Sequence, residues 1–229
     1  MKRQILSIFA LAAASAFAQD AAPDKAALQQ RVGDIKQSIA QNQAQLKQYA
    51  WTETVQISLK GEEKKRTQAD CKYGPDGKVQ KTPIGAAPPA KKQKGLKGKI
   101  VANKIDEMKG YMDRVGSLVK RYLPPNPQTM QASYKAGKAT IDKASGELVF
   151  HDYAKPGDTL TFTFDTATKK LRSIAVATYL DKPDEKVTVT ARFSALADGT
   201  NFLEESVLDA TAKEIQVKTT NSGHHKAGG

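Results

Sequence analysis

The residues able to carry acid–base, nucleophilic or metal chemistry are few and scattered in this sequence. It contains three histidines and one cysteine among 229 residues. His151 stands beside Asp152, but successive residues of a strand point to opposite faces, so a surface pair is a simpler interpretation than a catalytic couple. His224 and His225 could bind a metal ion weakly as an adjacent pair, yet their polar, glycine-rich surroundings are more typical of a solvated tail.

No spacing in the chain marks a catalytic or metal centre. The H-E-x-x-H, G-x-S-x-G, phosphate-loop, paired-cysteine and EF-hand patterns are all missing from the sequence. We therefore expect no catalytic residue, no metal site, no cofactor and no enzyme, although a hydrolase with an unmarked site stays open. A lone cysteine, Cys71, allows no intramolecular disulfide, so packing must hold the fold. Cys71 is expected either as a half-buried strand residue or as a link to another chain.

The N-terminus predicts export. A basic start over residues 1–3 precedes an apolar run over 5–17, and Ala16 and Ala18 are the small residues that signal peptidase reads. The run of about 13 residues is short for a membrane-spanning helix, which needs about 20. We expect a signal peptide over 1–18, cleavage near Ala18, and a protein that is periplasmic or secreted.

The excess positive charge lies in the middle of the chain. The formal net charge is +12, and residues 60–123 hold seventeen basic and seven acidic side chains. An exported basic segment meets lipid headgroups and acidic polymers, so we expect an anionic membrane surface or acidic partner and no nucleic acid. A solvated face that only aids solubility is the other interpretation. The densest part, a basic patch, consists of five lysines: Lys91, Lys92, Lys94, Lys97 and Lys99.

Two long amphipathic helices are predicted. Apolar residues recur at alternating intervals of four and three over residues 25–47, and again from Val101 to Tyr122. A coiled coil is the other interpretation of the first stretch. The proline- and lysine-rich segment 85–99 should be a mobile loop. A further short helix is expected over 127–135.

Strand signals fill the remainder of the chain. Two-residue alternation or turn-bounded runs predict strands over 51–59, 65–73 and 79–84. From residue 140 onward, apolar sets separated by turn signals predict about six more strands, paired in sequence as an antiparallel meander. A single sheet of about nine strands must twist and curl, and its concave face offers cover for the apolar helix faces.

These elements predict an α+β fold in one domain over residues 19–223, with a disordered tail over 224–229. The expected architecture is a single curved antiparallel sheet of about nine strands, an unclosed half-barrel, with two or three helices packed over its concave face.

The element order, together with the strand–turn–strand stretches over 160–174 and 196–221, resembles the LolA-like and RseB-like unclosed β-barrels. That superfamily includes outer-membrane lipoprotein carriers and a periplasmic stress sensor. The resemblance implies a monomer that binds a lipid acyl chain, a lipoprotein or another lipidated partner in an apolar groove, without catalysis. The alternative is an electrostatic scaffold that docks an acidic partner or polymer through residues 60–123.

The groove implied by this resemblance would be lined by apolar strand residues. The candidates are Trp51, Val55, Ile57, Phe162, Phe164, Val187 and Val189. Each of them could equally belong to an ordinary dry core.

Overall fold

The computed structural model of the protein describes residues 41–85, 95–142, 144–168 and 170–227, and from residues 95–102 the backbone alone. The strands are β1 (Tyr49–Leu59), β2 (Glu62–Tyr73), β3 (Val79–Ile84), β4 (Ala139–Asp142), β5 (Glu147–His151), β6 (Thr159–Phe164), β7 (Leu171–Tyr179), β8 (Lys186–Ala195), β9 (Asn201–Ala210) and β10 (Ile215–Lys226). The helices are α2 (Gly95–Val119), α3 (Pro127–Lys135) and the 3-10 helix η1 (Thr211–Lys213), and residues 41–46 are also helical.

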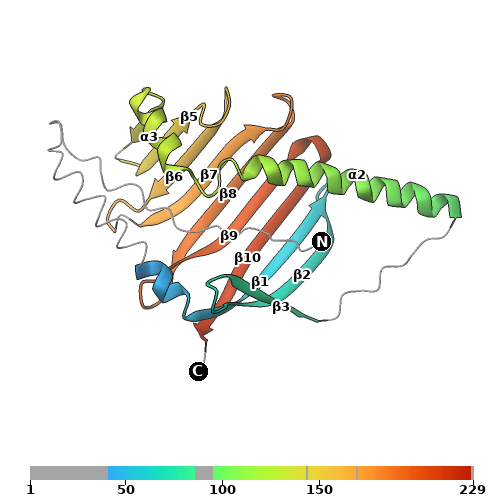
Figure 1. The fold of residues 1–229 in the computed structure, drawn as a ribbon, viewed down its shortest axis with the longest axis horizontal. Coiled ribbons are helices and arrows are strands. Elements are labelled where there is room, and N and C mark those ends of the chain that lie inside the picture. The colour runs from blue at the N-terminus through green and yellow to red at the C-terminus, as the bar shows by residue number, and fades with distance from the viewer. Residues whose placement is uncertain (1–40, 86–94, 143, 169, 228–229) are drawn as a thin grey trace.

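All ten strands form one antiparallel sheet in the order β3-β2-β1-β10-β9-β8-β7-β6-β5-β4 (Figure 1). Strands β4 to β10 form a meander in which each strand pairs with the next. The N-terminal strands extend this meander because β1 pairs with β10 along its whole length. The edge strands β3 and β4 do not pair with each other, so the sheet is unclosed. The predicted α+β fold on a single unclosed antiparallel sheet is confirmed.

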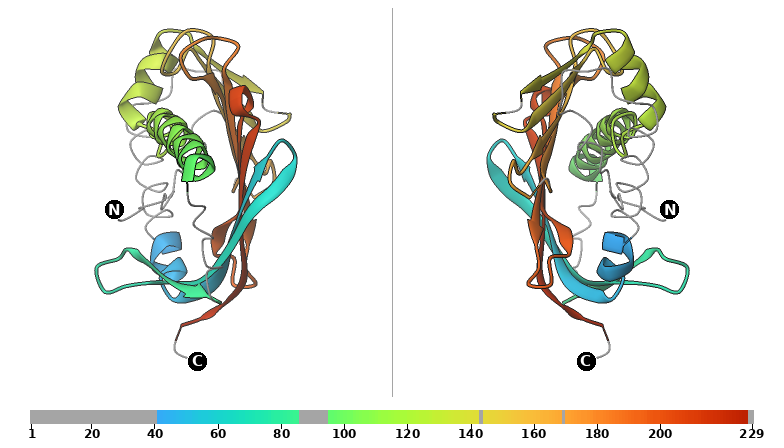
Figure 2. Two further views of the ribbon diagram at one scale, coloured as in Figure 1. Left: turned by 90° about the vertical axis from the view of Figure 1, so that its right-hand side faces the viewer. Right: turned by 90° about the vertical axis from the view of Figure 1, so that its left-hand side faces the viewer.

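Alternation along the strands separates the two faces of the sheet. In β6 the residues Leu160, Phe162 and Phe164 are buried, and the threonines between them are partly exposed. The sheet curves around the helices, which lie on its concave side (Figure 2). The apolar residues of β6 and β8 therefore face the helices, and the residues between them on the convex face are polar, mainly threonine in β6.

The hydrophobic core lies between the concave face and the C-terminal half of α2. Val115, Leu118 and Val119 are at most 6% exposed, and the chain beyond the helix buries Tyr122 and Leu123 as well. Burial of one such aliphatic side chain contributes about 1.5–3 kcal/mol. The first described side chains of α2 differ, because residues 103–107 are all exposed. The helix is thus firmly packed at one end only.

The structure differs from the sequence-based expectation at both ends of the sheet. The sheet has ten strands rather than nine, because β4 is four residues long and three of these are exposed, which leaves no alternation to detect. β10 continues to Lys226, so residues 224–226, expected in a disordered tail, belong to a strand. Their backbone pairs with β1, where Ala50 lies opposite His225.

The helices agree with the expectation in part. α3 confirms the helix expected over 127–135. α2 begins at Gly95, so residues 95–99, expected in a mobile loop, are helical. The helix can extend this far because residues 90–99 contain no proline and lysine favours helices. The expected signal peptide, residues 25–40 of the first helix and residues 86–94 lie outside the described residues.

Candidate functional site

The seven groove residues proposed from the sequence fall into two sets with different exposure. Four of them belong to the core beneath the helices and are at most 8% exposed: Phe162, Phe164, Val187 and Val189. The other three lie on β1 and are half-buried: Trp51, Val55 and Ile57. Only the β1 set retains surface that a ligand can reach without displacing core side chains.

A row of apolar residues joins the two sets across the concave face. The strand register places Ile57 opposite Val217, Val217 opposite Leu208, and Leu208 opposite Val189. Val189 is buried, whereas the other three are half-buried. The row therefore continues from the core onto a partly exposed surface of β9, β10 and β1 without a polar residue between them. We call Ile57, Val217 and Leu208 the open apolar row.

The methionines of α2 pack on the same side of the sheet. Met108 and Met112 are partly buried and pack against the core, whereas Ile105, one turn earlier, is 49% exposed. Methionine is flexible and fills irregular apolar spaces. Figure 1 shows the N-terminal end of α2 extending past the strands. The N-terminal half of α2 is therefore less tightly packed on the sheet than its C-terminal half.

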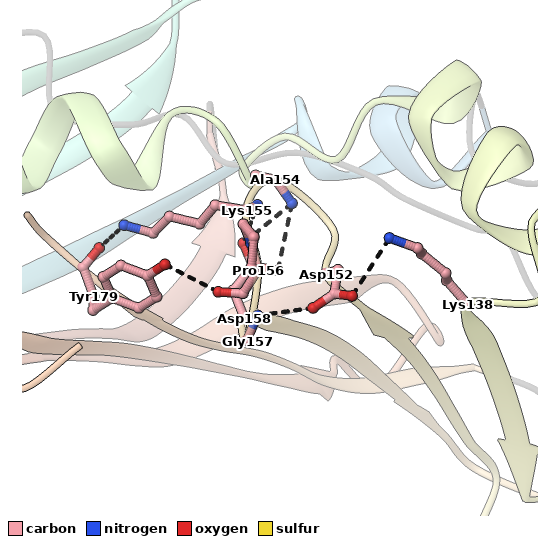
Figure 3. Close-up of polar contacts among 8 residues, drawn as sticks. All are labelled: Lys138, Asp152, Ala154, Lys155, Pro156, Gly157, Asp158 and Tyr179. Atoms are coloured by element: carbon pink, nitrogen blue, oxygen red, sulfur yellow. Dashed lines mark hydrogen bonds and ion pairs between the residues drawn. The ribbon is translucent and has the colours of Figure 1, made fainter. Parts of the chain in front are cut away.

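The opposite end of α2 is held by a buried polar network around the loop 152–158, part of which is drawn in Figure 3. The buried Asp158 side chain accepts a hydrogen bond from the Tyr122 hydroxyl at 2.5 Å and from the backbone N–H of Lys155 at 2.8 Å. The Tyr122 hydroxyl also lies 2.8 Å from the hydroxyl of Thr178. Burial, reinforced by the bond to Asp158, raises the pKa of Tyr122, so the phenol stays neutral and donates.

Lys155 and Tyr179 complete this network (Figure 3). The Lys155 ammonium donates to the backbone carbonyls of Tyr179 and Leu180 and lies 3.7 Å from the centre of the Tyr179 ring. The Tyr179 hydroxyl donates to the carbonyl of Pro156 at 3.0 Å. Burial is the main cause that lowers the pKa of Lys155. Since these groups are bonded to one another, the loop is a structural clasp that joins α2 to β7.

A cleft of about 610 Å³ lies where α2 approaches two turns at the end of the sheet. Its lining consists of Glu107, Gly110, Tyr111, Arg114, Glu185, Ala212 and Lys213. Lys213 pairs with Glu107 at 2.7 Å, and Arg114 pairs with Asp181 at 2.5 Å. The hydroxyl of Tyr111 is buried and has no hydrogen-bond partner in the described part of the chain. Burial raises the pKa of Tyr111. Sequence reasoning missed this cleft, because its residues come from distant parts of the chain.

Trp51, the first of the proposed groove residues, belongs to an aromatic cluster. Its indole N–H donates to the side-chain oxygen of Asn221 at 3.0 Å, and its ring stacks on His224 with centroids 5.9 Å apart. Phe202 packs on the same histidine at 4.1 Å. Burial lowers the pKa of His224, which favours the neutral ring. These contacts help to hold β10 in the sheet near its C-terminal end at Lys226.

The expected basic patch is largely outside the described side chains. Lys91, Lys92 and Lys94 fall in residues 86–94, and only the backbone of Lys97 and Lys99 is described. Among the side chains that are described, no group of three His, Cys, Asp or Glu residues could hold a metal ion. No helix in the same part of the chain has the length and apolar character to cross a membrane.

The comparisons with known proteins assign no relative. No family model, no curated protein and no solved structure matches the chain. The fold alone therefore defines the class: an α+β protein built on one unclosed antiparallel sheet of ten strands with helices on its concave side. Its function has to be argued from the surface that this arrangement leaves partly exposed.

Proposed function

We propose that the protein binds a lipid acyl chain, free or attached to a partner, between α2 and strands β9, β10 and β1. It acts without catalysis, as a carrier or sensor, in the manner implied by its resemblance to the LolA-type barrels. The observation that carries this proposal is the half-buried open apolar row, which continues the core that Met108 and Met112 pack against. An apolar surface of this kind is most stable when another apolar group covers it.

The hydrophobic effect supplies the driving force. Transfer of one methylene from water to an apolar site gains about 0.8 kcal/mol, so ten buried methylenes gain roughly 8 kcal/mol. Part of this gain offsets the lost freedom of the chain and of the protein side chains. Since association costs about 4 kcal/mol or more, a net affinity in the micromolar range, about 8 kcal/mol, needs about fifteen buried methylenes or more.

The proposal includes export to the periplasm or beyond, because residues 1–18 have the composition of a signal peptide. Sequencing the N-terminus of protein from a periplasmic extract should then give Gln19 as the first residue. Native mass spectrometry of the same material, followed by solvent extraction, would identify a lipid that co-purifies.

A matched pair of valines tests the binding surface. Val217 on β10 belongs to the open apolar row, whereas Val207 on β9 lies opposite Lys218 and Thr190 on the convex face. Both are half-buried. Val217→Asp should weaken binding of a fluorescent fatty acid at least tenfold, and Val207→Asp should leave it unchanged. The milder Val217→Thr keeps the side-chain shape and serves as a second variant if the aspartate prevents folding. Equal affinity in all variants would refute the proposed surface.

The alternative of an electrostatic scaffold predicts a different response to salt. Binding through the segment 60–123 should weaken steeply between 50 mM and 500 mM salt, since screening shortens the reach of exposed charges. Binding of an acyl chain on the open apolar row should change little over the same range. A single titration series at two salt concentrations separates the two functions.

A further inference from the structure

Tyr111 carries the one buried side-chain polar atom without a hydrogen-bond partner among the residues that the structure describes. The residue is 4% exposed, and it lines the cleft between α2 and the turns at the end of the sheet. Buried hydroxyls are nearly always bonded, so an unbonded one calls for an explanation. The cleft, at about 610 Å³, is far larger than one water molecule requires. Tyr111 therefore borders the cleft, and its buried hydroxyl has to become exposed before it can donate to a ligand there.

Two cations lie near the Tyr111 side chain. The guanidinium carbon of Arg114 lies 5.9 Å from the centre of the Tyr111 ring, and Lys213 lines the same cleft from η1. Their present partners, Asp181 and Glu107, have side chains that are 60% and 64% exposed. Ion pairs this exposed contribute little to stability. Both cations can thus exchange a surface carboxylate for a ligand anion at little cost.

The acidic residues of the cleft leave room for such an anion. Glu185 is the remaining carboxylate in the lining, and its side chain already accepts hydrogen bonds from the backbone N–H groups of Asp181 and Lys182. Glu107 is held by Lys213 and can turn toward water when that pair opens. A ligand anion would therefore meet one phenol donor and two released cations.

One side of the cleft lies close to the start of β10, the strand that carries Val217 of the open apolar row. Lys213 lies two residues before Ile215, a buried residue that pairs with Leu59 of β1 and Ala210 of β9. Tyr111 lies one turn from Met108 on α2. An amphiphile whose chain occupies the concave face would therefore carry its polar end toward the cleft.

We propose that this cleft binds a phosphate group through the Tyr111 hydroxyl, Arg114 and Lys213, and that the phosphate is the headgroup of the bound lipid. Phosphate suits donors from two elements, Tyr111 and Arg114 on α2 and Lys213 on η1, because its oxygens point in several directions and charge-assisted bonds to arginine are strong. The assignment of the phosphate to a lipid rests on the proposed acyl-chain function.

Calorimetric titration with three probes tests the site: octyl phosphate, octanol and inorganic phosphate. Octyl phosphate should bind at least tenfold more tightly than octanol to the unaltered protein. Arg114→Gln and Lys213→Gln should each remove most of this difference in affinity between octyl phosphate and octanol, and Tyr111→Phe should reduce the difference three- to tenfold. Lys120→Gln, an exposed position outside the cleft, is the charge-matched control and should change nothing. Octanol affinity should be the same in all variants.

Each other outcome overturns a defined part of the proposal. Equal binding of octyl phosphate and octanol in every variant would eliminate the headgroup site while leaving the acyl-chain function intact. Binding of inorganic phosphate that depends on Arg114, with no binding of octanol, would make the cleft a site for free phosphate and refute the lipid. No binding of any probe would refute both.

Discussion

Two buried tyrosines close together in the sequence should respond to the same substitution with opposite signs. Tyr111 and Tyr122 are both at most 4% exposed, and both pack in the core. The Tyr122 hydroxyl donates to Asp158 and contacts Thr178, whereas the Tyr111 hydroxyl has no partner in the described part of the chain. Replacement by phenylalanine removes one oxygen in each case and leaves the ring packing in place.

The expected magnitudes follow from these contacts. A hydrogen bond to a charged group contributes about 1.5–3 kcal/mol, so Tyr122→Phe should lower the free energy of unfolding by about 2 kcal/mol. Asp158 keeps its backbone donors, which argues against a larger loss. Tyr111→Phe removes a buried group that is already desolvated and unbonded, so it should raise the free energy of unfolding by about 1 kcal/mol. The two variants should therefore differ by about 3 kcal/mol.

Urea unfolding followed by fluorescence measures this difference, since Trp51 is the single tryptophan of the chain. The midpoints should move in opposite directions while the slope m stays constant. A loss of 1 kcal/mol or more in Tyr111→Phe would show that its hydroxyl is bonded in the folded protein. Equal losses in both variants would refute the reasoning that bonding rather than burial sets the effect.

Three further predictions concern other parts of the fold. Burial raises the pKa of the Cys71 thiol to about 11, so a disulfide reagent at pH 8 should react slowly with the folded protein and rapidly in urea. Hydrogen bonds from Tyr49 and Thr200 lower the pKa of Asp198 to about 2. The stability that these hydrogen bonds contribute is complete above pH 3.8, the ordinary pKa of an aspartate, and is lost as the pH falls toward 2. Thermal melts of Asp198→Asn should lack this dependence on acid pH. Asn126 caps α3 by accepting from two backbone N–H groups, so Asn126→Ala should lower the free energy of unfolding by about 1 kcal/mol, and unchanged melting would contradict the cap.

Periodicity in the sequence predicts most strands but fails at a bulge. Leu203 and Val207 share the odd positions of β9, which indicates one face. The register between β8 and β9 shifts after Arg192, so Leu203 pairs with Phe193 whereas Val207 pairs with Thr190 on the convex face. A bulge adds one residue to one strand and reverses the faces beyond it. For this reason Leu208, a member of the open apolar row, could not be predicted.

Tertiary contacts decide which apolar strand residues become core. Phe162 and Val187 have the same sequence pattern as Val55 and Ile57, yet the first two are buried and the last two are half-buried. The difference depends on where α2 crosses the sheet, and nothing in the strand sequences encodes that position. The cleft around Tyr111 was unpredictable for the same reason, since one helix and two distant turns form it.

The unequal attachment of α2 connects stability to the proposed binding. Its C-terminal half is fixed by buried packing and by the clasp at Asp158, whereas an exposed ion pair between Glu107 and Lys213 joins its N-terminal half to η1. Opening that half breaks an exposed ion pair, which contributes little to stability, and leaves the core around Val115, Leu118 and Val119 intact. A phosphate that captures Lys213 would compete with this same ion pair. Headgroup capture and admission of the acyl chain beneath α2 would then be one event, which gives the cleft and the open apolar row a common function.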